Sequence, residues 1–394
     1  MGKIASRLDN IKPSLTLSIT QKAQELRARG VDVISFSAGE PDFDTPAHIV
    51  KAAKDALDNG LTRYTPVAGM PDLRATIAAA NQEIRGVNCA PNQVVVTVGA
   101  KHALYGFFQA VINNEEEVII PAPYWVSYPD QVLLAGGKPV IVETSAKNNW
   151  MLTPDDLEKA VTSKTRALVL NTPSNPTGSI YDEDTLKALT QKALELNLWI
   201  ISDEIYKDIT YDGIKHISPV AFAGDKTDRV FIVDGVSKTF AMTGWRIGWG
   251  IGDAQVIAAI SKIQGQSTSN PASMAQAATL AAITQPKDFL KDWCKKYAKR
   301  RDIMVSGLNE IPTVECLKPQ GAFYVLPNMK AVIAKMGPKA TDTKLSAYLL
   351  EEGKVATVPG TAFGAPGYIR LSYATSTEAI KEGLIRLKDA INKI

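Results

Sequence analysis

The sequence predicts an α/β protein with a mostly parallel sheet and a second, smaller α+β domain. Short runs rich in Val and Ile alternate with helical patterns through the middle of the chain, which is typical of a parallel sheet covered by helices on both sides. The pattern changes after about residue 285, where long amphipathic stretches begin. The 394 residues also exceed the roughly 250 to 300 that a single core supports, which favours two domains.

Seven apolar runs are the candidate strands of the sheet. Most are apolar throughout and do not alternate with polar residues, as expected of strands that are buried on both faces. In chain order they are Val94–Val98, Val118–Ile120, Pro139–Glu143, Ala167–Leu170, Leu198–Ser202, Val230–Val233 and Ile247–Ile251.

Helical patterns separate these runs and dominate the C-terminal third. In Pro71–Arg85 a proline suits the first helical position, and four apolar residues (Leu73, Ile77, Ala80 and Ile84) form one stripe. Further helices are predicted at Thr185–Leu196, Phe289–Leu308 and Thr343–Glu352, with short strands at Ala322–Leu326 and Tyr368–Tyr373.

Composition excludes several classes of function. A net charge of +3 from 44 basic and 41 acidic residues does not suggest the concentrated basic patch that nucleic-acid binding needs. No run of about 18 apolar residues predicts a membrane span. Three widely spaced cysteines fit a reducing, cytoplasmic location, and no Cys or His pair has the spacing of metal ligands, so no metal is predicted.

Polar or ionisable residues follow four of the predicted strands. The segments are Gly99–Lys101, Asn171–Gly178, Asp203–Tyr206 and Asp234–Lys238. Ligands in open α/β sheets bind beyond the carboxyl ends of the strands, so we expect these four segments to meet at one crevice.

One of these segments is suited to a phosphate. Gly99, Ala100 and Lys101 open a helix directly after a strand, where free N–H groups and the positive end of the helix dipole favour anions. An ordinary strand-to-helix turn is the simpler alternative for this segment alone. Ser237 and Arg246 offer further donors to the same anion, although Arg246 alone also fits a surface ion pair.

The other segments carry residues suited to acid–base and carbonyl chemistry. Asp203 ends a strongly apolar run, so its carboxylate either caps a helix or pairs with a protonated ring nitrogen. Tyr206 either reaches the same ligand or packs in the core. Lys238 is either solvated or a nucleophile that forms a Schiff base, and Arg370 either joins a structural ion pair or clamps a carboxylate. Taken together, these groups indicate a pyridoxal 5'-phosphate site that acts on amino acids.

Longer motifs carry a resemblance to a known family. The matching segments are Ala38–Pro46, Arg63–Pro66, Pro123–Tyr128, Asn175–Gly178, Ser202–Tyr206, Ser237–Gly248 and Pro359–Gly364. From about Ile11 to the C-terminus the chain resembles fold-type I aminotransferases of class I, in particular the bacterial aspartate aminotransferases of subgroup Ib. The resemblance implies a large domain (residues 47–285) with a seven-stranded, mainly parallel sheet, and a small domain formed by residues 1–46 and 286–394.

The resemblance also implies a role for each site residue. Lys238 would carry pyridoxal phosphate as a Schiff base, and Asp203 would keep the pyridine nitrogen protonated. The remaining expected cofactor contacts are Tyr206 and Asn175 at the ring oxygen, Trp125 at the ring face, and Gly99, Ala100, Lys101, Ser237 and Arg246 at the phosphate. Tyr64 would reach the phosphate of the other subunit, which implies a homodimer with shared active sites. Arg370, with Asn175 and the Gly39 backbone, would bind the substrate's α-carboxylate.

Substrate choice is implied less directly. In the better-known branch of the family an arginine of the partner subunit binds the distal carboxylate, but the corresponding stretch, Gln266–Pro271, contains no arginine. In subgroup Ib a lysine after the glycine turn and hydroxyls near the N-terminus are implicated, which points to Lys101, Ser14 and Thr16. Lys12 adds a charge that would suit prephenate as a further acceptor.

Three alternatives remain open from the sequence. The same cofactor residues would serve a lyase, a decarboxylase or an aminotransferase with aromatic preference. A DNA-binding regulator with an aminotransferase-like domain would need a helix-turn-helix segment, and only about ten residues precede the matching region. A dehydrogenase would need a G-x-G-x-x-G turn, which the first helix lacks.

Overall fold

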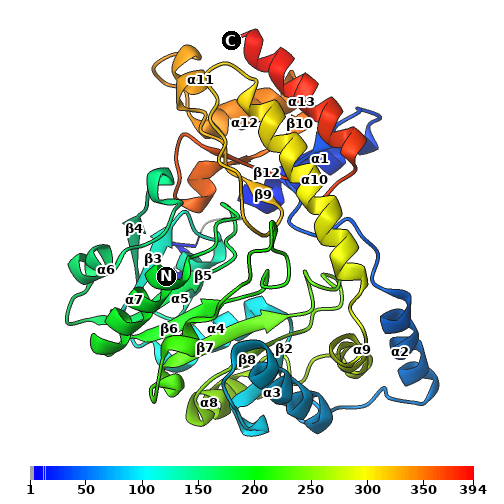
Figure 1. Cartoon of the computed structure of the whole chain (residues 1–394), viewed down its shortest axis with the longest axis vertical. Coiled ribbons are helices and arrows are strands. Elements are labelled where there is room, and N and C mark those ends of the chain that lie inside the picture. The colour runs from blue at the N-terminus through cyan, green and yellow to red at the C-terminus, as the bar shows by residue number, and fades with distance from the viewer. Residues whose placement is uncertain (1–3, 12, 14) are drawn as a thin grey trace.

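The protein is described by a computed structural model that covers residues 4–11, 13 and 15–394. Figure 1 shows two parts: a layered α/β part around a central sheet, and a smaller part in which the α1 segment lies with the C-terminal helices. Within the described residues, no helix is both long enough and apolar enough to cross a membrane.

A seven-stranded sheet forms the centre of the larger part. Its strands are β2 (Val94–Thr97), β3 (Glu117–Ala122), β4 (Lys138–Glu143), β5 (Thr165–Asn171), β6 (Trp199–Asp203), β7 (Val230–Gly235) and β8 (Gly248–Ile251). The order across the sheet is β2-β8-β7-β6-β5-β3-β4. Strand β8 runs antiparallel to both of its neighbours, and the other pairs are parallel. Each predicted apolar run falls on one of these strands, and the predicted mainly parallel α/β sheet is confirmed.

Helices cover both faces of this sheet. Along β6, Ile200 and Ile201 are both fully buried and belong to different apolar clusters, one on each face. The first face is covered by α2 (Ala47–Asp58), α3 (Pro71–Arg85), α6 (Pro154–Ala160), α7 (Glu183–Glu195) and α9 (Ser273–Thr284). The second is covered by α4 (Ala100–Val111), α5 (Ser127–Leu134) and α8 (Ala254–Gly265). Burial on both faces explains why the strand sequences are apolar throughout.

The smaller part joins segments from both ends of the chain. Strand β1 (Ile34–Ser35) pairs in parallel with β10 (Val355–Ala356), and Phe36 packs in the same core as the C-terminal helices. A three-stranded sheet has the order β11-β12-β9, with β9 (Tyr324–Val325), β11 (Val358–Pro359) and β12 (Ile369–Ser372). The helices here are α1 (Leu15–Ala28), α10 (Phe289–Asn309), α11 (Lys330–Lys335), α12 (Asp342–Glu351) and α13 (Thr377–Asn392). The domain limits, residues 47–285 against 1–46 with 286–394, remain a prediction.

Helix α3 has the predicted limits, but its predicted apolar stripe is wrong in its last turns. Ile84 is 44% exposed, whereas Asn81 and Arg85 are buried. The Arg85 guanidinium pairs with Glu204, which follows β6, and with Asp234 of β7, at 2.8 and 2.9 Å. Because Arg85 faces these carboxylates, the last turn of α3 buries its polar side and leaves Ile84 at the surface.

Candidate active site

A cavity of about 430 Å³ lies at the carboxyl ends of the parallel strands, next to the smaller part. It brings together residues that are far apart in the sequence. Of the predicted site residues, those that line the cavity are Gly39, Ala100, Lys101, Trp125, Asn175, Asp203, Tyr206, Ser237, Lys238, Arg246 and Arg370. The predicted meeting of strand ends at one crevice is therefore observed, while the role of each residue remains a proposal.

Two other predicted site residues, Gly99 and Tyr64, are described and do not line the cavity, and three more have no described side chain. Gly99 borders it through Arg246, as described below. Tyr64 is 91% exposed and lies outside the cavity lining. Lys12 and Ser14 lie outside the described residues. Thr16 belongs to helix α1, but its side chain is outside the described part of the chain.

One end of the cavity concentrates positive charge. Helix α4 begins at Ala100, so its first N–H groups and positive dipole end point toward this region. Gly99 has φ +80°, and a Cβ there would lie 2.5 Å from Nη2 of Arg246. The pKa of Lys101 is lowered by burial and by the neighbouring Arg246. A cradle that holds a guanidinium this close to a helix N-terminus fits a phosphate dianion.

Asp203 also lines the cavity, and the ring nitrogen is expected beside it. Its side chain is only 4% exposed, and Oδ2 accepts a 2.7 Å hydrogen bond from the Tyr128 hydroxyl. The Ile205 N–H donates to Oδ1 at 3.3 Å, and the chain then continues as turns, so the helix-cap alternative is wrong. Burial raises the pKa of Asp203 to about 6 despite these two hydrogen bonds. Among the described residues no cation forms a salt bridge with Asp203, which leaves room for a cationic ligand atom.

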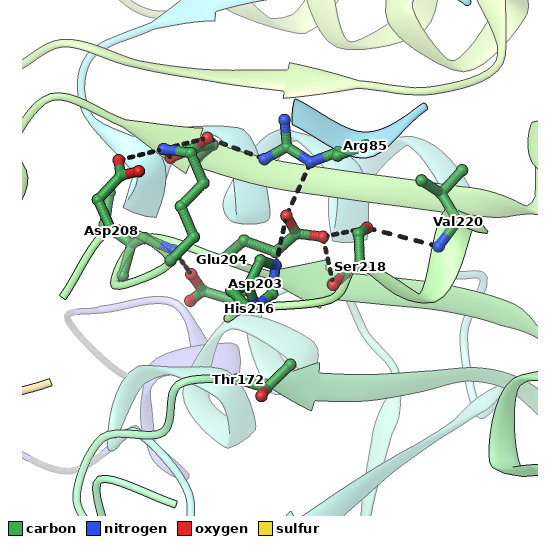
Figure 2. Close-up of polar contacts among 12 residues, drawn as sticks. Arg85, Thr172, Asp203, Glu204, Asp208, His216, Ser218 and Val220 are labelled. Atoms are coloured by element: carbon green, nitrogen blue, oxygen red, sulfur yellow. Dashed lines mark hydrogen bonds and ion pairs between the residues drawn. The ribbon is translucent and has the colours of Figure 1, made fainter. Parts of the chain in front are cut away.

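A buried network of charges lies next to Asp203, at the end of β6 (Figure 2). Glu204 accepts hydrogen bonds from Arg85 at 2.8 Å and from Ser218, and His216 Nε2 lies 3.0 Å from the same carboxylate. These contacts hold the pKa of Glu204 far below its usual range even though burial opposes them. Glu204 is therefore a fixed anion directly next to Asp203 in the chain.

The same network continues toward Lys238. Asp234 at the end of β7 pairs with Arg85 at 2.9 Å and with Lys207 at 3.0 Å. Lys207 also pairs with Asp208, which accepts a 2.8 Å hydrogen bond from the Thr239 hydroxyl. Thr239 follows Lys238, so a chain of buried and part-buried contacts links the backbone beside Asp203 to the backbone beside Lys238.

Lys238 projects into the cavity from the loop after β7. Its Nζ donates a 2.5 Å hydrogen bond to the carbonyl of Gly39. Burial lowers the pKa of Lys238 to about 8, with Arg370 and Arg246 acting in the same direction and Glu40 opposing them. At pH 7 a pKa of about 8 leaves roughly a tenth of the amine neutral, against a few parts in ten thousand at the ordinary value. The amine is thus prepared to act as a nucleophile or a base.

Arg370 lies on β12 with a guanidinium that is almost fully buried. Nη1 donates to Oδ1 of Asn175 at 3.0 Å, and Nη2 donates to the carbonyl of Ser37 at 2.8 Å. Its Nε is buried without a partner among the described residues, and neither of its two hydrogen-bond partners is a carboxylate. The structural ion pair considered for Arg370 is therefore wrong, and the unmatched charge fits an anionic ligand in the cavity.

Two tyrosines of the site were missed by the sequence analysis. Tyr128 stands in the quoted motif Pro123–Tyr128 but was given no role, although its hydroxyl contacts Asp203. Tyr324 lies on β9, and its hydroxyl is 2.9 Å from that of Tyr206. The motif was a signal for Tyr128, whereas nothing in the local pattern marks Tyr324.

Comparison with known proteins agrees with this geometry. The sequence model of the family "aminotransferase class I and II" matches residues 31–387. An aspartate aminotransferase of Bacillus subtilis is 46% identical over 391 residues, which covers 99% of both chains. A probable aspartate/prephenate aminotransferase of Aquifex aeolicus is 44% identical over 393 residues, again with 99% of both chains covered.

Solved structures show the same similarity. The aspartate aminotransferase of Thermus thermophilus with maleate superposes with a TM-score of 0.94 at 41% identity, covering 99% of this chain and 100% of that one. An aromatic aminotransferase of Pyrococcus horikoshii has a TM-score of 0.88 at 38% identity, covering 94% and 99% of the two chains. With a family match over most of its length and relatives of this identity, the chain belongs to the class I and II aminotransferases.

Proposed function

We propose that this protein is a pyridoxal 5'-phosphate-dependent aspartate aminotransferase. It exchanges the amino group reversibly between L-aspartate or L-glutamate and oxaloacetate or 2-oxoglutarate. The observation that carries the proposal is one cavity that combines Lys238, with its lowered pKa, the buried Asp203 and the unmatched guanidinium of Arg370. The names of its relatives support aspartate as the donor. Three unpaired cysteines agree with a cytoplasmic location.

The residues around the cavity suit the parts of the cofactor. When bound, pyridoxal phosphate supplies an aldehyde that combines with an amine and a ring that withdraws electrons. Asp203 would face the ring nitrogen, and its negative charge would favour the protonated nitrogen. The other holding groups would be Tyr206 and Asn175 at the ring oxygen, Trp125 at the ring face, and Lys101, Ser237, Arg246 and the N-terminus of α4 at the phosphate.

Lys238 and Arg370 divide the work on the substrate. Arg370 binds the α-carboxylate, assisted by Asn175 and the backbone at Gly39, and so fixes the orientation of the Cα–H bond. The neutral Nζ of Lys238 takes the proton from Cα of the substrate and delivers it to the cofactor.

The distal carboxylate is the least specified part of the substrate site. Lys101 lines the cavity, and its Nζ lies 4.9 Å from the centre of the Trp125 ring. We propose that Lys101 contacts the distal carboxylate of aspartate, with Ser14 and Thr16 as further partners. A lysine is a flexible point charge without the fixed fork of arginine, so it tolerates carboxylates at different reach.

A substrate panel with 2-oxoglutarate as the acceptor tests this specificity. Aspartate is expected to be the best donor by kcat/KM, and aromatic amino acids are expected to be weak. A protein that prefers tyrosine or phenylalanine over aspartate would contradict the proposal, and so would release of pyruvate or ammonia without transfer to 2-oxoglutarate.

Prephenate as an additional acceptor tests the role of Lys12. The Lys12→Gly variant is expected to lower kcat/KM for prephenate about twofold to fivefold, as for one lost charge contact, and to leave kcat/KM for oxaloacetate nearly unchanged. The reason for choosing Lys12 is its positive charge, which would suit the second carboxylate of prephenate. Equal losses for both acceptors, or a wild type without prephenate activity, would limit the substrates to the shorter acids.

A mixing experiment tests the homodimer with shared sites. Tyr64 is almost fully exposed and outside the cavity of its own chain, which supports a contact with a partner subunit. If Tyr64 serves the partner's site, mixed dimers of Lys238→Ala and Tyr64→Ala contain one native site. Random mixing then restores about a quarter of the wild-type activity, since half of the dimers are mixed. Mixing Lys238→Ala with Arg370→Ala restores none, and the reverse pattern would overturn the assignment of these residues to subunits.

A further inference from the structure

Tyr324 is a buried residue that neither the sequence motifs nor the proposed mechanism uses. It lies on β9, is fully buried as a residue and lines the active-site cavity. Strand β9 pairs with β12 at Ser372↔Tyr324 and Leu371↔Val325. Arg370 lies on β12, so Tyr324 and Arg370 line the cavity from neighbouring strands. A Cβ on Gly39 would lie only 3.2 Å from the Tyr324 hydroxyl, which shows how closely the surroundings hold this group.

The hydroxyl of Tyr324 has a defined partner. It lies 2.9 Å from the hydroxyl of Tyr206. Burial raises the pKa of both groups above the ordinary value, so each carries its proton at neutral pH. A phenol has one proton to donate, and the proposed function assigns the proton of Tyr206 to the cofactor's ring oxygen. Tyr324 must then be the donor between the two hydroxyls, and a donor on Tyr206 makes Tyr206 itself a stronger donor.

The ring of Tyr324 has a separate partner. The guanidinium carbon of Arg370 lies 4.5 Å from the centre of the Tyr324 ring and 4.9 Å from that of Phe363. Both distances are within the range in which a cation is attracted to an aromatic face. Because Asn175 and Ser37 already hold two of its nitrogens, these rings restrict the remaining rotation of the guanidinium.

We propose that Tyr324 is a positioning residue that joins two parts of the substrate site, with its hydroxyl orienting Tyr206 and its ring orienting Arg370. The inference rests on the proposed function and adds a residue to that site. One side chain then sets both the strength of the hydrogen bond at the ring oxygen and the affinity for the substrate's α-carboxylate. The two contributions come from different atoms, so different substitutions separate them.

The Tyr324→Phe variant removes the hydroxyl and keeps the ring. In protein loaded with pyridoxal phosphate, the pH midpoint of the visible absorbance change is expected to rise by about half a unit to one unit. The reason is that the deprotonated form leaves the negative charge on the ring oxygen, and a weaker donor at Tyr206 stabilises that charge less. Tyr206→Phe should shift the midpoint in the same direction and further.

The Tyr324→Leu variant removes the ring as well. Binding of maleate, a dicarboxylate with no amine to transfer, is measured by calorimetry on the loaded protein. Its dissociation constant is expected to rise about threefold to thirtyfold in Tyr324→Leu and to stay within about twofold in Tyr324→Phe. Tyr373→Phe is the matched control, because Tyr373 is buried in the same core and bonds to Tyr211 but does not line the cavity. It should change neither measurement.

The outcomes separate this inference from the proposed function. A wild type that binds no pyridoxal phosphate overturns both. If the loaded wild type shows the absorbance change with pH and Tyr324→Phe has the same pH midpoint, only the role of the Tyr324 hydroxyl is overturned. Equal maleate affinity in wild type and Tyr324→Leu overturns the contact with Arg370. Where the leucine variant does not fold, Tyr324→Phe still decides the role of the hydroxyl, and an unchanged midpoint there overturns the joint role proposed for Tyr324.

Discussion

Replacing Lys238 by alanine is expected to abolish turnover while some cofactor binding remains. The phosphate cradle and Asp203 still hold pyridoxal phosphate, but the nucleophile and the base are both lost. Loss of the base alone accounts for roughly 10² to 10⁴ in rate. The measurement is kcat for aspartate with 2-oxoglutarate, together with absorbance of the bound cofactor. Lys226→Ala is a control, because this lysine bonds to the Leu194 carbonyl and does not line the cavity.

Chemical trapping identifies the lysine directly. Borohydride treatment of wild-type protein should fix the cofactor to Lys238, as read by peptide mass, and should give no fixed cofactor in Lys238→Ala. Full activity in Lys238→Ala, or trapping on another lysine, would end the assignment.

The rate of cofactor capture should also depend on pH in a characteristic way. Burial lowers the pKa of Lys238 to about 8 in the cofactor-free protein, so the neutral amine accumulates as the pH rises toward that value. The rate of pyridoxal phosphate binding, followed by absorbance after mixing, should rise to about pH 8 and then level off. With a lysine of ordinary pKa, the rate of binding would continue to rise toward pH 10. A rate that rises steadily to pH 10 would contradict the lowered pKa.

Much of the fold could be predicted because its strands are buried on both faces. Such strands need apolar residues at every position, so the runs at Val94–Val98 and Leu198–Ser202 stood out from their surroundings. The order of the strands in the sheet was not predicted, because no comparable sequence pattern indicates it. The last turns of α3 were misread because their burial depends on Glu204, 119 residues away in the chain from Arg85.

The site was predicted in part for a similar reason. Lys238 and Asp203 follow strands, and the strand-end rule located them without knowledge of the sheet's order. Tyr324 has no such signal, because it belongs to a two-residue strand of the smaller part whose pairing with β12 is set by long-range contacts. The network of Arg85 and Glu204 was missed because a charged residue at the end of a helix usually faces solvent.

Removing the charge of Asp203 is expected to lower kcat by at least about a hundredfold. A carboxylate beside the pyridine nitrogen favours its protonated form, and preorganised charges of this kind typically contribute 10² to 10³ or more. Asp203→Asn keeps the shape of the side chain and an acceptor for the Ile205 N–H, whereas Asp203→Ala loses both. Both variants should be similarly inactive. A near-normal rate in Asp203→Asn would show that the charge is not needed.

A structural cap gives the matched control. Asp253 is the N-cap of α8 and accepts hydrogen bonds from the N–H groups of Gln255 and Val256. Asp253→Ala should lose about 1 kcal/mol of stability and keep its activity. Asp203→Ala should instead lose its activity, and activity as high as that of Asp253→Ala would reduce Asp203 to a structural residue.

In the cofactor-free protein, the ionised form of buried Asp203 is expected to lower the free energy of unfolding. Burial raises the pKa of Asp203 to about 6 from its ordinary 3.8, so the folded state holds this proton more tightly than the unfolded state does. Stability from this group is therefore present below pH 3.8 and falls as the pH rises to about 6. The loss is on the order of 3 kcal/mol. Asp203→Asn has no such proton, so its denaturant midpoint should lose less between pH 4 and 7 than that of the wild type. Identical pH profiles for the two proteins would mean that Asp203 is not held in a raised-pKa state, and that its charge is balanced before any cofactor binds.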